Sequence, residues 1–339
     1  MDLKKLLLYI LKSILKLYNY EIIQSHNLYD WQKTPEALAG YNPTILTNEA
    51  KEFLHLNNPR IKELKLRYTK LDKDVTSHLL WKDTHLGPDD IQYFRGDNPY
   101  VWQFRGPNMN ILGYTLTTFY VKSIDNLDLL KLLEEDECFG NFTFSIDNKI
   151  ISRDLLDSII EIYFLEKYLN LSLLTDITIL DIGAGYGRLA HRMVNALPNI
   201  KEYLCTDAIA ISTFISEFYL KFRGIDNRAK VVPLDKIEVI LNKKSVSIAI
   251  NIHSFSECGL SAIDWWMSLL KKNTVKYLMI VPNSDNHGGE LLLTVDGKDF
   301  SEVIEKYGYK LIAKEPKYRD EIVQKYAINP TYFHLFELQ

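Results

Sequence analysis

The chain has 339 residues, 47% of them apolar and 25% charged, and its formal net charge is −4. This composition is typical of a soluble protein with a sizeable core, and the length predicts about two domains. The small negative charge argues against a nucleic-acid partner, which requires a basic surface. The cysteines lie far apart without a metal-binding spacing, which favours a reducing, cytoplasmic location and no metal site: Cys138, Cys205 and Cys258.

The first predicted element is a helix over residues 3–17. Leucine or isoleucine recurs at positions 3, 7, 10, 14 and 17, and lysines occupy other faces. We expect this helix to pack on the body of the protein or on a second subunit, and the pattern does not fix the oligomeric state. The alternative is peripheral contact of residues 1–18 with an anionic inner membrane. The apolar stretch Leu6–Leu11 is too short for the core of a signal peptide.

The chain divides near residue 150. In residues 1–150, helical patches alternate with breaks such as Gly87-Pro88. We therefore predict a mainly helical cap that covers the site of the second domain and forms an acceptor pocket, or alternatively a separate interaction domain. Four side chains of this region are candidates for acceptor binding. The arginines suit a phosphate or carboxylate and the aromatic rings suit the face of a sugar, although Trp102 could equally pack between domains: Arg95, Tyr100, Trp102 and Arg105.

Residues 151–339 alternate between strand and helix patterns, which predicts an α/β domain with a Rossmann-like, seven-stranded, mostly parallel sheet. Expected helices cover 153–169, 187–197, 210–222, 260–270 and 299–307. Expected strands cover 177–181, 201–206, 229–234, 245–251, 275–281, 309–315 and 331–338. Because only about fifteen residues without a clear helix join the last two strands, the final strand should be antiparallel.

A glycine-rich loop follows the strand at 177–181. After Asp181, glycine falls on every second residue, and the sequence of the loop is Gly183-Ala184-Gly185-Tyr186-Gly187-Arg188. Glycine allows a positive φ and a close approach of the backbone to a ligand, and the next helix directs its N–H groups there. A dinucleotide fingerprint would need a third glycine where Arg188 stands. The pattern instead resembles motif I of S-adenosyl-L-methionine-dependent methyltransferases.

Further candidates for cofactor binding lie at the ends of the neighbouring strands. Asp207, followed by Ala208, is placed to accept hydrogen bonds from the two ribose hydroxyls. Leu234 could cover adenine and Asp235 could accept from its amino group, although a solvated turn aspartate is as plausible an interpretation. Arg153 and Asn251 complete the cofactor set. The acidic residues of helix 153–169 form either a solvated face or part of the cleft: Asp154, Asp157 and Glu161.

The segment 251–257 is polar where a buried strand should be apolar, which indicates a function. His253 is the candidate general base, with an ordinary pKa of about 6.5. Glu257 either orients His253 or is itself the base, and Asn283 is a candidate for acceptor binding. The alternative is that His253 merely packs. A metal site formed by these two residues with Asp285 and His287 is not expected, because the four lack a compact ligand spacing.

Several stretches together resemble a family of bacterial sugar O-methyltransferases found with surface-polysaccharide genes. The matching segments are 93–96, 100–103, 135–140, 152–158, 180–192 and 253–257. The resemblance implies S-adenosyl-L-methionine as cofactor and methyl transfer to a sugar hydroxyl of a free, nucleotide-linked or lipid-linked glycan. Alternatives are a methyltransferase for another small molecule and a catalytically silent cofactor-binding subunit. An NAD-dependent sugar enzyme is disfavoured by Arg188, and the absence of an Asn-Pro-Pro-Tyr motif after the fourth strand disfavours amine methylation.

Overall fold

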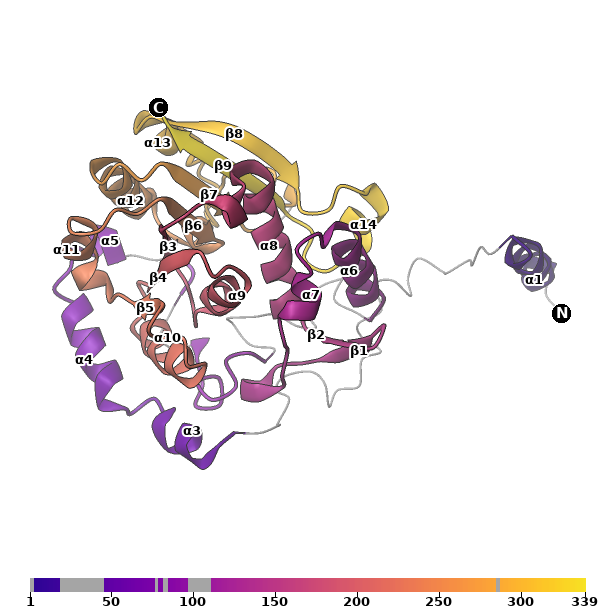
Figure 1. Ribbon diagram of the computed structural model, residues 1–339, viewed down its shortest axis with the longest axis horizontal. Helices are drawn as coiled ribbons and strands as arrows, with labels where there is room; N and C mark the ends of the chain where they lie inside the picture. The colour runs from indigo at the N-terminus through magenta and orange to yellow at the C-terminus, as the bar shows by residue number, and fades with distance from the viewer. Residues whose placement is uncertain (1–2, 19–45, 77–78, 82–84, 97–110, 285–286) are drawn as a thin grey trace.

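The structure, a computed structural model, describes residues 3–18, 46–76, 79–81, 85–96, 111–284 and 287–339. Its centre is a seven-stranded sheet with helices on both faces (Figure 1). The strands are β3 (Ile177–Ile182), β4 (Ile200–Thr206), β5 (Ala229–Val231), β6 (Ile248–Ile252), β7 (Tyr277–Val281), β8 (Tyr309–Pro316) and β9 (Tyr332–Leu338). Their spatial order is β5-β4-β3-β6-β7-β9-β8, and β9 is antiparallel to both of its neighbours. The Rossmann-like sheet and its reversed last strand are thus confirmed.

The helices of this part of the chain flank the sheet, and crossovers between parallel strands are right-handed as a rule. They are α8 (Arg153–Leu169), α9 (Arg188–Ala196), α10 (Ala210–Phe222), α11 (Ile237–Leu241), α12 (Leu260–Lys272), α13 (Ser301–Lys306) and α14 (Glu321–Tyr326). The chain leaves β3 toward β4 through α9, whereas it leaves β6 toward β7 through α12 in the opposite direction. When two connections have the same handedness but run in opposite directions across the sheet, their helices lie on opposite faces of it. The edge between β3 and β6 is therefore the point where the strand order reverses.

Local sequence explains why these elements begin and end where they do. Every residue of β3 is buried, as expected for a central strand covered on both faces. Ser152 caps α8 by accepting a hydrogen bond from the Leu155 N–H, as its position in the sequence predicts. β5 ends three residues before its expected end, because Pro233 cannot donate to a ladder, and the chain turns at Leu234–Lys236. The connection expected to lack a helix contains α14, which Asp320 caps.

Residues before 150 contribute α1 (Leu3–Lys16), α3 (Asn48–Phe53), α4 (Pro59–Tyr68), α5 (Lys73–Thr76), α6 (Ile111–Ile124), α7 (Leu129–Leu132) and a hairpin of β1 (Phe144–Ile146) and β2 (Lys149–Ile151). In this region α4 packs on α10, α5 on α12 and α6 on α8. Buried apolar residues of α4 and α6 belong to the same hydrophobic cluster as those of the sheet. The division at residue 150 stays a prediction, and β2 crosses it. Within the described residues, no helix is both long and apolar enough to span a bilayer.

Candidate functional site

Three of the predicted segments meet at the carboxyl ends of β3, β4 and β6, where an open α/β sheet binds its ligands. The Gly185 N–H, in the loop after β3, donates to Oδ2 of Asp207, which follows β4, at 3.0 Å. A Cβ atom added at Gly183 would lie 2.3 Å from Cβ of Ser254, which follows β6. The glycine loop is therefore held between the ends of the two neighbouring strands.

The three glycines of the loop differ in what surrounds them, although all have a positive φ. Gly183 lies against Ser254, and a Cβ at Gly187 would lie 3.0 Å from Cδ2 of Leu220, so both positions are closed by packing. A Cβ at Gly185 would meet no atom within 4 Å. Gly185 is thus the point where the backbone borders open space, which fits a ligand that passes close to the loop.

Asp207 is fixed beside this open space. Its carboxylate accepts from the N–H of Gly185 and, at 2.8 Å, from the N–H of Ile209. Burial, together with the charges of Glu257 and Asp181, raises the pKa of Asp207 to about 7, although these two bonds act to lower it. Each carboxylate oxygen can accept a second hydrogen bond, so the group can also take a diol.

Asp181 is buried within β3 rather than in the open space. The Tyr203 hydroxyl donates to its Oδ2 at 2.9 Å, and burial raises the pKa of Asp181 to about 7. This arrangement places the carboxyl behind the glycine loop, where it contacts the sheet.

The acidic face of α8 is buried, so the interpretation as a solvated face is wrong. Its three carboxylates pair with cations of the chain instead of facing water. Arg188 makes two hydrogen bonds with Glu161, at 2.8 and 2.9 Å, and a third with Ser158. Asp157 lies between Arg153 and Lys317, whose charges lower the pKa of Asp157 against the effect of burial.

The adenine end predicted around Leu234 and Asp235 is covered by α4. Arg67 of this helix donates to both carboxylate oxygens of Asp235, at 3.1 and 2.7 Å. The Leu234 side chain is buried, and its N–H donates to the hydroxyl of Tyr68, also on α4. Asp235 is therefore neither a solvated turn residue nor an unpaired acceptor. The sequence contains no motif that links α4 to this turn.

At the end of β6, Asn251 brackets the loop that follows. Its Nδ2 donates to the Ile182 carbonyl and its Oδ1 accepts from the Phe255 N–H, both at 2.9 Å. Both ends of this amide are engaged by the backbone of the chain. Asn251 thus fixes the end of β6 against the end of β3.

His253 adopts a strained backbone conformation, with a φ of 66° and a ψ of −32°. Its Nδ1 lies 3.2 Å from the Pro282 carbonyl, which can only accept, so the neutral ring carries its proton on Nδ1 and a lone pair on Nε2. Burial and the charges of Arg153 and Arg188 lower the pKa of His253 to about 4. The expectation of an ordinary histidine pKa is therefore wrong, because the ring is desolvated beside two cations.

Glu257 is held by two side chains from outside its own loop. The Trp81 Nε1–H donates to Oε2 at 2.6 Å, and Asn283 Nδ2 donates to Oε1 at 3.4 Å. Burial raises the pKa of Glu257 in spite of these bonds. Since no bond joins Glu257 to His253, the role of Glu257 as an orienting partner is not supported. Trp81 is the residue that sequence reasoning missed, since its partner lies 176 positions away.

Arg95 does not face an acceptor, and its predicted role in substrate binding is wrong. Its side chain has no exposed surface and lies among three carboxylates of the chain, at 2.6 to 3.1 Å: Glu135, Asp136 and Asp154. Asp154 also accepts from the hydroxyl of Tyr186 in the glycine loop. Of the other acceptor candidates, Tyr100, Trp102 and Arg105 lie outside the described residues.

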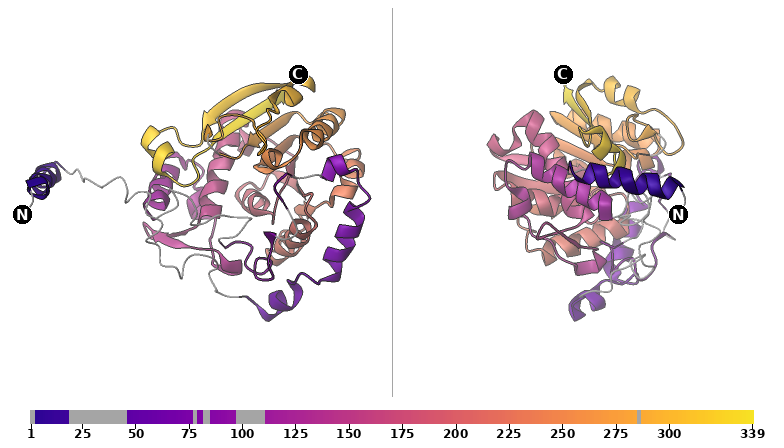
Figure 2. Two further views of the ribbon diagram at one scale, coloured as in Figure 1. Left: turned by 180° about the vertical axis from the view of Figure 1, so that it is seen from behind. Right: turned by 90° about the vertical axis from the view of Figure 1, so that its right-hand side faces the viewer.

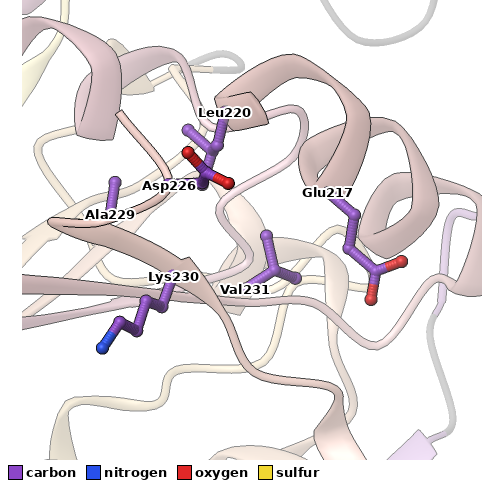
Figure 3. Close-up of a pocket in the computed structure, with 6 residues that line it drawn as sticks. All are labelled: Glu217, Leu220, Asp226, Ala229, Lys230 and Val231. Atoms are coloured by element: carbon purple, nitrogen blue, oxygen red, sulfur yellow. The ribbon is translucent and has the colours of Figure 1, made fainter. Parts of the chain in front are cut away.

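Two further features bear on ligand binding. A pocket of about 280 Å³ lies between α10 and the edge strand β5, and it contains none of the predicted site residues (Figure 3). It is lined by Glu217, Leu220, Asp226, Ala229, Lys230 and Val231. In the part of the chain that the structure describes, no group of three or more His, Cys, Asp or Glu side chains could hold a metal ion. Asp285 of the four-residue metal hypothesis lies outside that part.

Neither a family of related sequences nor a curated protein matches the chain. The chain is similar in part to solved structures, and one of these is a SAM-dependent methyltransferase from Aquifex aeolicus, 15% identical over 51% of this chain and 89% of that chain, with a TM-score of 0.39. A second is precorrin-6y C5,15-methyltransferase from Geobacter metallireducens, 14% identical over 53% of this chain and 88% of that chain, with a TM-score of 0.36. A third is the cyclase SpnF, 13% identical over 67% of this chain and 94% of that chain, with a TM-score of 0.39. A likeness at these values does not indicate which reaction the chain performs, because one fold can serve several reactions.

Proposed function

We propose that the chain is an S-adenosyl-L-methionine-dependent O-methyltransferase that acts on a sugar hydroxyl during the synthesis of a surface polysaccharide. The observation that carries the proposal is the open space at Gly185, bordered by the Asp207 carboxylate. A nucleoside cofactor needs both features at the carboxyl end of a strand: a backbone that it can approach and an acceptor for its ribose hydroxyls. The structure thus offers residues that fit the cofactor.

The same loop favours this cofactor over a dinucleotide. Arg188 stands where a dinucleotide fingerprint needs its third glycine, and Glu161 and Ser158 hold the guanidinium in place. A side chain locked there narrows the space available to a pyrophosphate, whereas S-adenosyl-L-methionine has none. Asp207 then serves the ribose through the carboxylate that borders the open space at Gly185.

When bound, the cofactor supplies an electrophilic methyl group, and the new oxygen–carbon bond forms as the carbon–sulfur bond breaks with its electron pair left on sulfur. The proton of the acceptor hydroxyl must then go to the protein. A sugar hydroxyl is too weakly acidic to ionise near neutral pH, so a positioned base is required. Two proton acceptors follow β6, which supports a hydroxyl acceptor.

His253 is the base that we favour. Its depressed pKa keeps the ring neutral at pH 7, and the bond from Nδ1 to Pro282 leaves the Nε2 lone pair for the acceptor proton. Glu257 is the second candidate, because its raised pKa makes it a stronger base than an ordinary glutamate. The charge of Glu257 contributes to the raised pKa of Asp207, which supports a place for Glu257 near the cofactor.

The choice of a sugar rests on the resemblance of six sequence segments. Five of them lie in the described part of the chain, namely 93–96, 135–140, 152–158, 180–192 and 253–257, and the sixth, 100–103, lies outside it. The test is transfer of a labelled methyl group from S-adenosyl-L-methionine to nucleotide sugars and to purified surface glycans. We expect a labelled product whose mass and fragmentation place one methyl on an oxygen. Cofactor binding without transfer to any glycan, but with transfer to another small molecule, would reject the sugar and keep the methyltransferase. The absence of cofactor binding would reject both.

A further inference from the structure

Helix α1 exposes an apolar face that nothing in the described part of the chain covers. Leu3, Leu7, Ile14 and the following Leu17 have exposed fractions of 68%, 58%, 48% and 83%. The helix lies apart from the sheet and its helices in Figure 1 and in the left view of Figure 2. Such a row of exposed leucine and isoleucine side chains is unusual for a protein surface and marks an interaction site.

The helix is amphipathic over its whole length. At about 100° per residue, the apolar positions 3, 6, 7, 8, 10, 11, 14 and 15 fall within an arc of about 200°. Positions 5, 12 and 16, all lysine, fall within about 40° on the opposite side, whereas the fourth lysine, Lys4 in the first turn, falls inside the apolar arc. The helix contains four lysines and no acidic residue, in a chain whose net charge is −4.

We propose that α1 docks this protein on the surface of a bilayer that contains anionic lipid. An arc this wide suits a helix that lies in the plane of a membrane interface, whereas a two-helix contact uses a narrower stripe. Two signals act together here: burial of apolar side chains among the acyl chains, and attraction of the lysines to anionic headgroups. The proposal does not depend on the proposed methyl transfer.

A second copy of the chain is the competing occupant. Pairing of two α1 helices through their apolar faces would leave Lys5, Lys12 and Lys16 of each copy on the outer side of the pair, and α1 has no acidic residue to offer them as a partner. Such a pair would leave the positive charge of the helix uncompensated. An anionic lipid surface provides the complementary charge instead.

The test is co-sedimentation of the full-length chain with vesicles of phosphatidylcholine alone or with phosphatidylglycerol added. We expect binding to the mixed vesicles, weak binding to phosphatidylcholine, and loss of binding at high salt. The double variant Leu7→Gln, Ile14→Gln should weaken binding on the order of a hundredfold, because two buried apolar side chains are lost. The matched control Tyr9→Gln, Ser13→Gln, on the lysine side of the helix, should stay within about threefold.

A charge variant separates the two signals. Lys12→Gln with Lys16→Gln should weaken binding to the mixed vesicles about twentyfold and leave binding to phosphatidylcholine unchanged. Thermal melting of every variant should match that of the parent, since α1 lies apart from the hydrophobic core. Equal binding of the Leu7→Gln, Ile14→Gln variant would overturn the proposal. The proposal would also be overturned if the parent protein did not bind vesicles and light scattering showed a dimer that this variant dissociates.

Discussion

Asp207 is the side chain on which cofactor affinity should depend most. Asp207→Asn removes the charge but keeps the shape, and we expect it to weaken binding of S-adenosyl-L-methionine by about 1.5–3 kcal/mol, the scale of a hydrogen bond to a charged group. Calorimetric titration of the folded variant measures this loss. Asp226→Asn is the control, since Asp226 is an exposed aspartate outside the proposed cofactor site. Unchanged affinity in Asp207→Asn would reject its role at the ribose.

The raised pKa of Asp207 adds a pH dependence with a definite sign. With a pKa of about 7 in the free protein, the carboxyl is mostly protonated at pH 6 and mostly ionised at pH 8. The ionised form accepts from both ribose hydroxyls, so affinity for the cofactor should increase as pH rises from 6 to 8. Calorimetry at several pH values measures the trend, and the trend should vanish in Asp207→Asn. A parent protein whose affinity is flat over this range would contradict the assignment.

The base at the end of β6 can be identified from rates. His253→Ala should lower kcat by about 100-fold or more with little change in cofactor affinity, whereas the exposed His55→Ala should have no effect. Because the pKa of His253 is about 4, a plot of kcat against pH should show no change of slope near pH 6.5. If Glu257 is the base, Glu257→Gln is inactive and the parent rate falls on the acid side of a pKa above the usual glutamate range.

At the scale of the element, the glycines of the loop have different roles: Gly183 and Gly187 pack against the chain, whereas Gly185 borders open space. Gly185→Val should abolish cofactor binding, because the side chain would enter the open space in front of the loop. Gly224→Val is a matched control: Gly224 also has a positive φ and nothing within 4 Å of an added Cβ, but it follows α10 away from the loop. Both variants bear the same backbone strain, of about 1–2 kcal/mol. Calorimetry and melting curves should therefore show equal destabilisation and a loss of binding in Gly185→Val alone.

Local pattern predicted most of the elements, because strand alternation, helix caps and glycine spacing act over short distances. α8 and α10 were expected at their observed bounds, and β3 within one residue of its own. The glycine loop and Asp207 could be found in the same way, because each follows a parallel strand and the carboxyl ends of parallel strands lie at one edge of the sheet. Contacts between distant positions could not be found. Arg67 with Asp235 and Trp81 with Glu257 are separated by 168 and 176 positions, and neither pair has a local signature.

At the scale of the whole molecule, a buried ion network joins the regions on the two sides of residue 150. Arg95 pairs with Asp154 of α8 and with Glu135, which also pairs with Arg192 of α9, while Asp136 pairs with Arg223. A network of this kind adds little when intact, because desolvation offsets the attraction between the charges. The network explains why Arg95, which the sequence suggests as a binding residue for an anionic acceptor, is buried instead.

Arg95→Met tests whether this network holds the molecule together. Removing the cation leaves Glu135 and Asp154 buried with less compensating charge, so the free energy of unfolding should fall by about 3–5 kcal/mol. Arg60→Met is the control: the pair of Arg60 with Glu217 is nearly one-third exposed on both sides, and its loss should cost under about 1 kcal/mol. Urea unfolding at pH 7 measures both. Because Asp154 also accepts from Tyr186 in the glycine loop, Arg95→Met should in addition weaken cofactor binding, whereas Arg60→Met should not. Equal, small effects of the two variants on stability would show that the buried network is dispensable.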